Sequence, residues 1–111
     1  MYANNEIGTV ESVRDIAKIL RHHRKMQGTA YPYFHTDACQ AAHFLDINVL
    51  RLGVDMMTLN AAKIYGPKGV GLLFARRGVP ISAVIAGEQE RGLRGGTEYG
   101  AGIVGFAEAL T

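Results

Sequence analysis

The spacing of apolar residues near the start of the chain predicts a helix that begins after Ser12. Apolar side chains recur at helical intervals between residues 13 and 20. Ser12 and Asp15 have the spacing of a capping box, in which each side chain bonds a free backbone N–H of the first turn. Residues 21–25 are mostly basic and Gly28 follows, as is typical of a helix C-terminus. We therefore expect one amphipathic helix that ends at Gly28.

Three short apolar runs predict β-strands, because each is bounded by turn residues. They span residues 31–36, 56–59 and 70–75, and residues 1–3 could be the tail of a further strand. A closing helix is expected over residues 97–110, although it contains Gly100, Gly102 and Gly105. A glycine costs about 1 kcal/mol in a helix interior. Close packing of this helix against a neighbour would explain the three glycines.

The alternation of strands, helices and glycine-containing turns predicts an α/β fold. Polar or charged residues follow the predicted strands, at Asn5, at Asp37 with Gln40, at Lys63 and in the loop of residues 66–71. Ligands of open α/β sheets bind at the carboxyl ends of the strands. We therefore expect a ligand-binding or catalytic site where these residues come together.

Composition narrows the possible functions without naming one. The chain has 111 residues, 48% of them apolar, which predicts one domain at most and excludes a disordered tail. No apolar run is long enough for a membrane helix, and a net charge of +2 does not indicate a nucleic-acid or membrane partner. A single cysteine excludes a disulfide framework, His22 and His23 lack a second pair of metal ligands, and no signal-peptide pattern is present. We expect a cytoplasmic protein without a metal site.

Each polar position has an ordinary structural interpretation when it is taken alone. Asp37 suits a turn, Lys63 suits a solvated loop, and the loop of residues 66–71 lacks the Gly-Lys-Ser/Thr of a nucleotide-binding P-loop. Taken together they fit the needs of pyridoxal phosphate, which requires a lysine for covalent attachment, an acid at its ring nitrogen and hydrogen-bond donors for its phosphate.

Four segments carry a resemblance to one family. They are Asn4-Asn5-Glu6-Ile7-Gly8, Thr36-Asp37-Ala38-Cys39-Gln40, Lys63-Ile64-Tyr65-Gly66-Pro67-Lys68-Gly69 and Arg91-Gly92-Leu93-Arg94-Gly95-Gly96-Thr97. In this order they resemble the middle of the cysteine desulfurases, which are pyridoxal-phosphate enzymes of aminotransferase class V. The resemblance covers nearly the whole chain. It implies that residues 1–111 are part of the large cofactor-binding domain of a fold-type I (aspartate aminotransferase-like) enzyme, with a mainly parallel sheet and flanking helices.

The resemblance implies a role for five residues. Lys63 matches the lysine that binds the cofactor covalently and moves protons at the α- and β-carbons of the substrate. Asp37 matches the carboxylate at the pyridine nitrogen, and Gln40 matches the donor to the phenolic oxygen. Asn5 matches an asparagine near that oxygen and the substrate carboxylate, and Thr97 matches a threonine that reaches the cofactor phosphate of a neighbouring subunit. A homodimer with shared sites is therefore implied.

The chain departs from the family pattern near Lys63 and after the first helix. Asn60 stands where a hydroxyl residue usually binds the phosphate, and Ala62 stands where histidine is common. An asparagine amide can still donate a hydrogen bond, so we keep Asn60 among the cofactor-binding candidates. The segment from Gln27 to Tyr33 is longer than the usual connection, an insertion that a surface loop tolerates.

The activity that the resemblance implies is the conversion of L-cysteine to L-alanine. The sulfur would leave as an enzyme persulfide for iron–sulfur cluster assembly, passed to a scaffold or another acceptor. Selenocysteine lyase, a related class V lyase and a non-catalytic α/β module without cofactor are the alternatives, and substrate preference and acceptor stay open.

Several expected parts of the family have no counterpart in the sequence. The upstream phosphate-binding cup, the histidine that stacks on the cofactor, the downstream catalytic cysteine loop and the arginine for the substrate carboxylate are all missing. We therefore expect a fragment that is inactive in isolation and leaves sheet edges unpaired. Cys39 is interpreted as a small structural cysteine. His35 matches a family histidine and fits a strand side chain equally well, while Arg91 and Arg94 fit either an anion-binding or a solvated loop.

Overall fold

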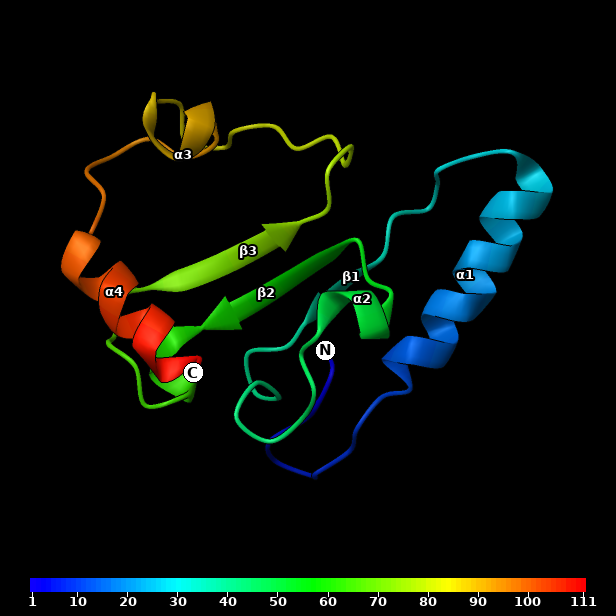
Figure 1. The fold of residues 1–111 in the computed structure, drawn as a ribbon, viewed down its shortest axis with the longest axis horizontal. Helices are drawn as coiled ribbons and strands as arrows, with labels where there is room; N and C mark the ends of the chain where they lie inside the picture. The colour runs from blue at the N-terminus through cyan, green and yellow to red at the C-terminus, as the bar shows by residue number, and fades with distance from the viewer.

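A mixed sheet of three strands lies at the centre of the computed structural model, which describes residues 1–111 (Figure 1). The strands are β1 (His35–Asp37), β2 (Met56–Asn60) and β3 (Gly71–Ala75), in that order across the sheet. β1 pairs with β2 in parallel, with Asp37 opposite Thr58. β2 pairs with β3 antiparallel, with Asn60 opposite Gly71. The α/β prediction is confirmed. One of the two strand pairings in this chain is parallel and the other is antiparallel, so the three strands do not form a mainly parallel sheet.

The lengths of the two connections explain this topology. A parallel pair needs a crossover of about a dozen residues or more, whereas an antiparallel pair needs only a short turn. Residues 38–55, which include α2 (Val49–Leu52), are long enough to return the chain to the same end of the sheet. The connection between β2 and β3 contains only the 3-10 turn η1 (Ala61–Lys63) and a loop, so β3 runs back along β2.

Helix α1 (Val13–Gln27) forms where its apolar spacing predicts it. Gly28 ends it in the left-handed conformation, with φ of 61°, and its N–H donates to the Arg24 carbonyl. The predicted capping box is wrong. Ser12 makes no side-chain cap, and the Asp15 carboxylate instead accepts a hydrogen bond from Lys18 at 2.7 Å. A lysine one turn ahead is an alternative partner for Asp15 that the capping pattern ignores.

The first predicted strand is much shorter than its apolar run. Residues 31–36 were expected to be extended and paired, but only His35–Asp37 join the sheet. Pro32 has no N–H for a ladder, and the Phe34 N–H donates to the Asp55 carboxylate at 2.9 Å instead. Because the Asp55 side chain takes the Phe34 N–H, Phe34 cannot use this donor for strand pairing, and the strand begins at His35. The other two strands match their predicted ranges within one residue.

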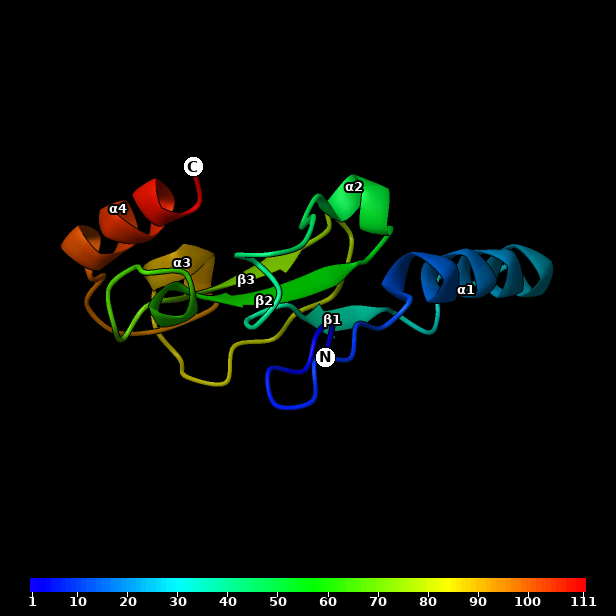
Figure 2. The same cartoon turned by 90° about the horizontal axis from the view of Figure 1, so that it is seen from below.

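Helices cover one face of the sheet. α2 and α4 (Gly100–Ala109) lie on the same side of the strands in Figure 2. The buried core includes Met57, Leu59, Val54 and Phe106. Two of the α4 glycines are explained by close packing, as predicted, because a Cβ at Gly102 would overlap the Tyr99 ring and a Cβ at Gly105 would lie 3.2 Å from Pro67. Gly100 faces open space.

The other face of the sheet is more open. Only 15 of 111 residues are buried, and the radius of gyration is 15.4 Å, against about 13 Å for a compact domain of this length. His35 and Asp37 are exposed on this face, while Thr36 between them points into the core. A short irregular helix, α3 (Gln89–Gly92), precedes α4. None of the helices has the length and apolar character that crossing a bilayer would require.

Candidate active site

The parallel pairing of β1 and β2 brings Asp37 and Lys63 to the same edge of the sheet. Asp37 is the last residue of β1, and Lys63 ends η1, which follows β2 directly. Cys39 lies close enough to both groups for each charge to act on the pKa of its thiol. The topology therefore places a carboxylate and an amine at adjacent strand ends, where α/β proteins bind their ligands.

Asp37 is an ionised carboxylate with free accepting capacity. Its Oδ1 accepts one hydrogen bond, from the Cys39 N–H at 2.9 Å, and its carbonyl accepts from the Tyr2 N–H at 2.7 Å. The Cys39 N–H holds the pKa of the Asp37 carboxyl below its usual value, against the opposing effect of partial burial. Asp37 keeps its charge at neutral pH and can still accept a donor from a ligand.

Lys63 is exposed on a turn that is itself well anchored. The Asn60 side chain caps this turn, since its Oδ1 accepts from the Ala62 N–H at 2.9 Å. Ala61 and Ile64 are buried on either side of the exposed pair that contains Lys63. The Lys63 amine makes no hydrogen bond or ion pair within the chain. A fixed backbone thus carries a free amine to the edge where Asp37 lies.

The Asn60 side chain can still donate a hydrogen bond, because only its oxygen is used for capping. The amide nitrogen remains a donor that no group of the chain accepts. Asn60 can therefore act both as a cap and as a donor. Gln40, half-buried three residues beyond Asp37, adds a second amide at the same edge.

Asn5 and Thr97 make no hydrogen bond with this group within the chain. Asn5 is exposed in the first turn, and Thr97 is exposed on the segment that connects α3 and α4. Sequence reasoning missed the structural role of Asn4, whose Oδ1 accepts from the Glu6 N–H at 2.9 Å and the Ile7 N–H at 3.2 Å. An asparagine followed by polar residues and a glycine is a signal for such a turn.

His35 joins the same sheet face through a contact that the sequence does not reveal. Its Nε2 lies 2.7 Å from the Thr58 Oγ1, which belongs to the neighbouring strand. The register of β1 against β2 brings His35 and Thr58 together, so the pair cannot be predicted from their spacing in the sequence. The interaction orients the imidazole on the face that also presents Asp37.

Cys39 has the chemistry of a structural cysteine. Burial and then the neighbouring Asp37 carboxylate raise the pKa of its thiol to about 11. Its Sγ lies 3.8 Å from the Thr58 carbonyl oxygen, to which the thiol donates. Since the thiolate is the reactive form, this thiol is a poor nucleophile at neutral pH.

The donor set at this edge fits pyridoxal phosphate. The cofactor needs an amine for attachment, an anion beside its ring nitrogen and hydrogen-bond donors. Lys63 offers the free amine, Asp37 offers an ionised carboxylate with an unused oxygen, and Asn60 and Gln40 offer amide donors. Asp37 and Lys63 are exposed at this edge of the sheet, and Asn60 and Gln40 are half-buried.

Comparison with protein families gives an independent result. The family model described as aminotransferase class-V matches residues 1–111. Among curated proteins, cysteine desulfurase IscS of Dictyoglomus turgidum is 45% identical over 99% of this chain, and putative cysteine desulfurase IscS 1 of Bacillus subtilis is 43% identical over 99%. The chain spans 26% and 27% of these two relatives. It thus corresponds to about a quarter of their length.

Solved structures give the same result at the level of the fold. A NifS-like protein superposes with a TM-score of 0.89 at 42% identity, covering 99% of this chain and 29% of the other. SspA in complex with cysteine superposes with a TM-score of 0.85 at 40% identity, covering 98% and 30%. DndA from Streptomyces lividans reaches 0.82 at 36% identity, covering 99% and 31%. The fold-type I prediction is confirmed by these neighbours.

Proposed function

Since this chain belongs to the aminotransferase class V family, we propose that it is part of a pyridoxal-phosphate-dependent cysteine desulfurase. The observation that carries the proposal is the placement of Asp37 and Lys63 at adjacent ends of parallel strands. The names of the curated relatives and the neighbour solved with cysteine support L-cysteine as the substrate.

Each residue at this edge has a defined task in the proposal. When bound, pyridoxal phosphate would supply an electron sink. The Asp37 carboxylate, whose pKa stays low, would hold the proton at the ring nitrogen. The Asn60 amide would be a donor for the phosphate, and Gln40 would be a donor for the phenolic oxygen. Lys63 would hold the cofactor covalently and move protons at the α- and β-carbons of the substrate.

The proposed reaction converts L-cysteine to L-alanine. The bond between Cβ and sulfur breaks, the sulfur passes to an enzyme thiol as a persulfide, and a proton is added at Cβ. Cys39 does not serve as that thiol, because its pKa of about 11 leaves almost no thiolate at neutral pH. The acceptor cysteine is therefore another residue of the enzyme.

The proposed protein acts as a cytoplasmic homodimer that delivers sulfur to an iron–sulfur scaffold or another acceptor. In such a dimer Thr97 and Asn5, which make no hydrogen bond with Asp37 or Lys63 in the single chain, would complete the site. Thr97 would bind the phosphate of the neighbouring subunit's cofactor, and Asn5 would bind the substrate carboxylate. Their exposure in the single chain agrees with these roles.

Covalent trapping tests the cofactor site. The purified chain is incubated with pyridoxal phosphate, reduced with sodium borohydride, digested and analysed by mass spectrometry. We expect the cofactor mass on the peptide that contains Lys63, and no label on that position in Lys63→Ala. Lys68→Ala is the matched control, because Lys68 is an exposed lysine in the next loop and should leave labelling unchanged.

Three outcomes would contradict the proposal in whole or in part. Equal labelling of Lys63 and of other exposed lysines would show ordinary surface reactivity rather than a site. An unchanged yield in Asp37→Asn would show that the carboxylate does not hold the cofactor. A Lys63-specific label with no release of sulfide from cysteine by the full-length enzyme would leave the cofactor site standing and overturn the desulfurase activity.

A further inference from the structure

A cavity of about 500 Å³ lies between α1 and the beginning of β2. It is at the opposite end of β2 from Lys63, so it does not belong to the candidate active site. Pockets for small molecules have volumes of about 300–1,000 Å³. This cavity therefore has room for a small ligand.

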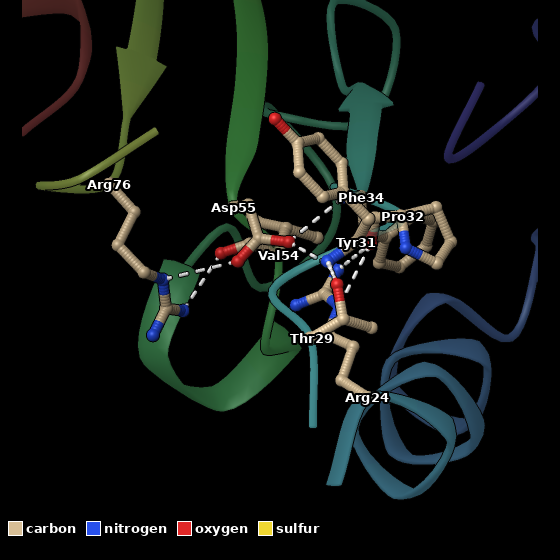
Figure 3. A network of polar contacts seen from close by, with 8 residues as sticks. All are labelled: Arg24, Thr29, Tyr31, Pro32, Phe34, Val54, Asp55 and Arg76. Atoms are coloured by element: carbon tan, nitrogen blue, oxygen red, sulfur yellow. Dashed lines mark hydrogen bonds and ion pairs between the residues drawn. The ribbon is translucent and has the colours of Figure 1, made fainter. Parts of the chain in front are cut away.

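Three arginines and one aspartate are the charged residues of its lining: Arg21, Arg24, Arg76 and Asp55. Asp55 is already neutralised from both sides, as Figure 3 shows. Its Oδ2 lies 2.7 Å from the Arg24 Nη2, and its Oδ1 lies 3.6 Å from the Arg76 Nε. The Phe34 N–H also donates to Oδ2, at 2.9 Å. With three positive charges and one negative charge, the lining keeps a net charge of +2.

Arg21 is the arginine that no protein group neutralises. It makes no ion pair and no hydrogen bond within the chain, although α1 carries it to the cavity wall. Its guanidinium lies against Gly53, where an added Cβ would come within 2.7 Å of the Arg21 Nη2 and 3.1 Å of the Ala17 Cβ. The absence of a side chain at Gly53 thus gives the guanidinium its place, with its donors unused.

The remaining wall is apolar. Leu20, Phe34 and Leu50 line the cavity beside the arginines. An arginine fork suits the two oxygens of a carboxylate or phosphate, and an apolar wall suits a short hydrocarbon or aromatic body. The two features stand side by side in one cavity.

The geometry points to a binding site for a small anionic compound, with a phosphate or carboxylate at Arg21 and an apolar body against Leu20, Phe34 and Leu50. Arg24 and Arg76, which also line the cavity, add positive potential while they form ion pairs with Asp55. The site is independent of the proposed function, because none of its residues lies at the edge that carries Asp37 and Lys63.

Titration of the ¹⁵N-labelled chain by nuclear magnetic resonance tests the site. The probes are phenyl phosphate, benzoate and the neutral benzyl alcohol. We expect saturable shifts of the Gly53, Asp55 and Arg76 amide signals with the two anions and none with the alcohol. A response to phenyl phosphate alone would assign the ligand head group as phosphate, and a response to benzoate alone would assign it as carboxylate.

Variants separate the cavity from general attraction to a basic surface. Arg21→Gln should weaken binding about tenfold, because it removes a charge-assisted contact. Arg21→Lys should retain part of the affinity and guards against a folding defect. Lys25→Gln on the same helix is the matched control for charge, and Lys63→Ala is the control for the cofactor edge. Both controls should bind as the wild type does.

The inference is overturned if neither anion gives a saturable shift, or if benzyl alcohol binds as well as phenyl phosphate. It is also overturned if Arg21→Gln keeps the wild-type affinity, or if Lys25→Gln weakens binding as much. Trapping at Lys63 is a separate readout, so failure of this cavity would leave the cofactor proposal untouched.

Discussion

Asp37 and Asp55 stand at opposite ends of the same parallel strand pair and have opposite surroundings. Asp55, just before β2, is buried and receives hydrogen bonds from Arg24 and from the Phe34 N–H, while Arg76 approaches its other oxygen (Figure 3). Asp37, at the end of β1, accepts one side-chain hydrogen bond, from its own turn. The Asp55 carboxylate joins three distant segments of the chain, whereas the Asp37 carboxylate bonds only within its own turn.

The causes of the pKa shifts separate the two carboxylates further. Burial alone would raise the pKa of Asp55, but Arg24, the Phe34 N–H and Arg76 together lower it. At Asp37 the Cys39 N–H is the main cause of the low pKa. Both groups are ionised, but the Asp55 oxygens face Arg24, Arg76 and the Phe34 N–H, whereas Asp37 is exposed and its Oδ2 has no partner within the chain. A satisfied carboxylate stabilises the fold, and an unsatisfied one is available for chemistry.

Removing Asp55 is the largest perturbation that this comparison predicts. Asp55→Ala leaves Arg24 partly buried without its partner, and breaking a buried ion pair costs about 3–5 kcal/mol. Asp37→Ala removes one exposed hydrogen bond and should cost about 1 kcal/mol or less. Urea denaturation followed by circular dichroism measures both free energies of unfolding.

The control for these variants is Asp46→Ala, which removes an exposed ion pair with Arg51 and a hydrogen bond from the Asn48 N–H. Exposed pairs contribute little, so its stability should match that of the wild type within about 1 kcal/mol. If Asp37→Ala destabilised the chain as much as Asp55→Ala, the division into a structural and a chemical carboxylate would be wrong.

Lowering the pH should destabilise the fold through both carboxylates, Asp37 and Asp55. A carboxyl with a lowered pKa stabilises the fold fully above its unfolded pKa of about 3.9, and this contribution is lost as the pH falls through the folded value. We expect the free energy of unfolding to fall as the pH drops below about 4, with Asp55 as a main contributor because its pKa is lowered in the fold. Asp55→Asn should flatten this part of the curve, measured as unfolding free energy against pH, more than Asp37→Asn does. The reverse order would contradict the assignment of Asp55 as the stabilising carboxylate.

The sequence predicted the Asp37 end of the molecule far better than the Asp55 end. Strand ends with polar residues are local patterns, so the sequence alone groups Asp37, Gln40 and Lys63, while Asn60 joins them only through the resemblance to a family. The Asp55 network depends on Arg24 and Arg76, which lie 31 and 21 residues away along the chain. No local pattern encodes such a partnership. The same network takes the Phe34 N–H, which is why the first strand begins later than its apolar residues suggest.

The reaction rate of the Cys39 thiol depends on the negative charge of the neighbouring Asp37 carboxylate. With a pKa raised to about 11, it should react with iodoacetamide at pH 8 at least about tenfold more slowly than a free cysteine peptide. Asp37→Asn removes the negative charge beside the thiol, so the reaction should become faster, although burial keeps part of the shift. Mass spectrometry gives the rate without ambiguity, since Cys39 is the only cysteine. A rate equal to that of the peptide would refute the raised pKa.

The two asparagine caps allow the smallest and most selective test. Asn60 caps the turn that carries Lys63, and Asn48 caps α2, accepting from the Leu50 and Arg51 N–H groups. Replacing either by alanine removes a cap worth about 1 kcal/mol, so both variants should lose similar stability in urea denaturation. Only Asn60→Ala should also reduce covalent labelling of Lys63 by pyridoxal phosphate, because it loosens the turn and removes the amide donor. Asn60→Ser keeps an oxygen for the cap and a donor, and should restore labelling. If Asn48→Ala lowered the labelling equally, the effect of Asn60 would be general destabilisation, and its place at the cofactor edge would be lost.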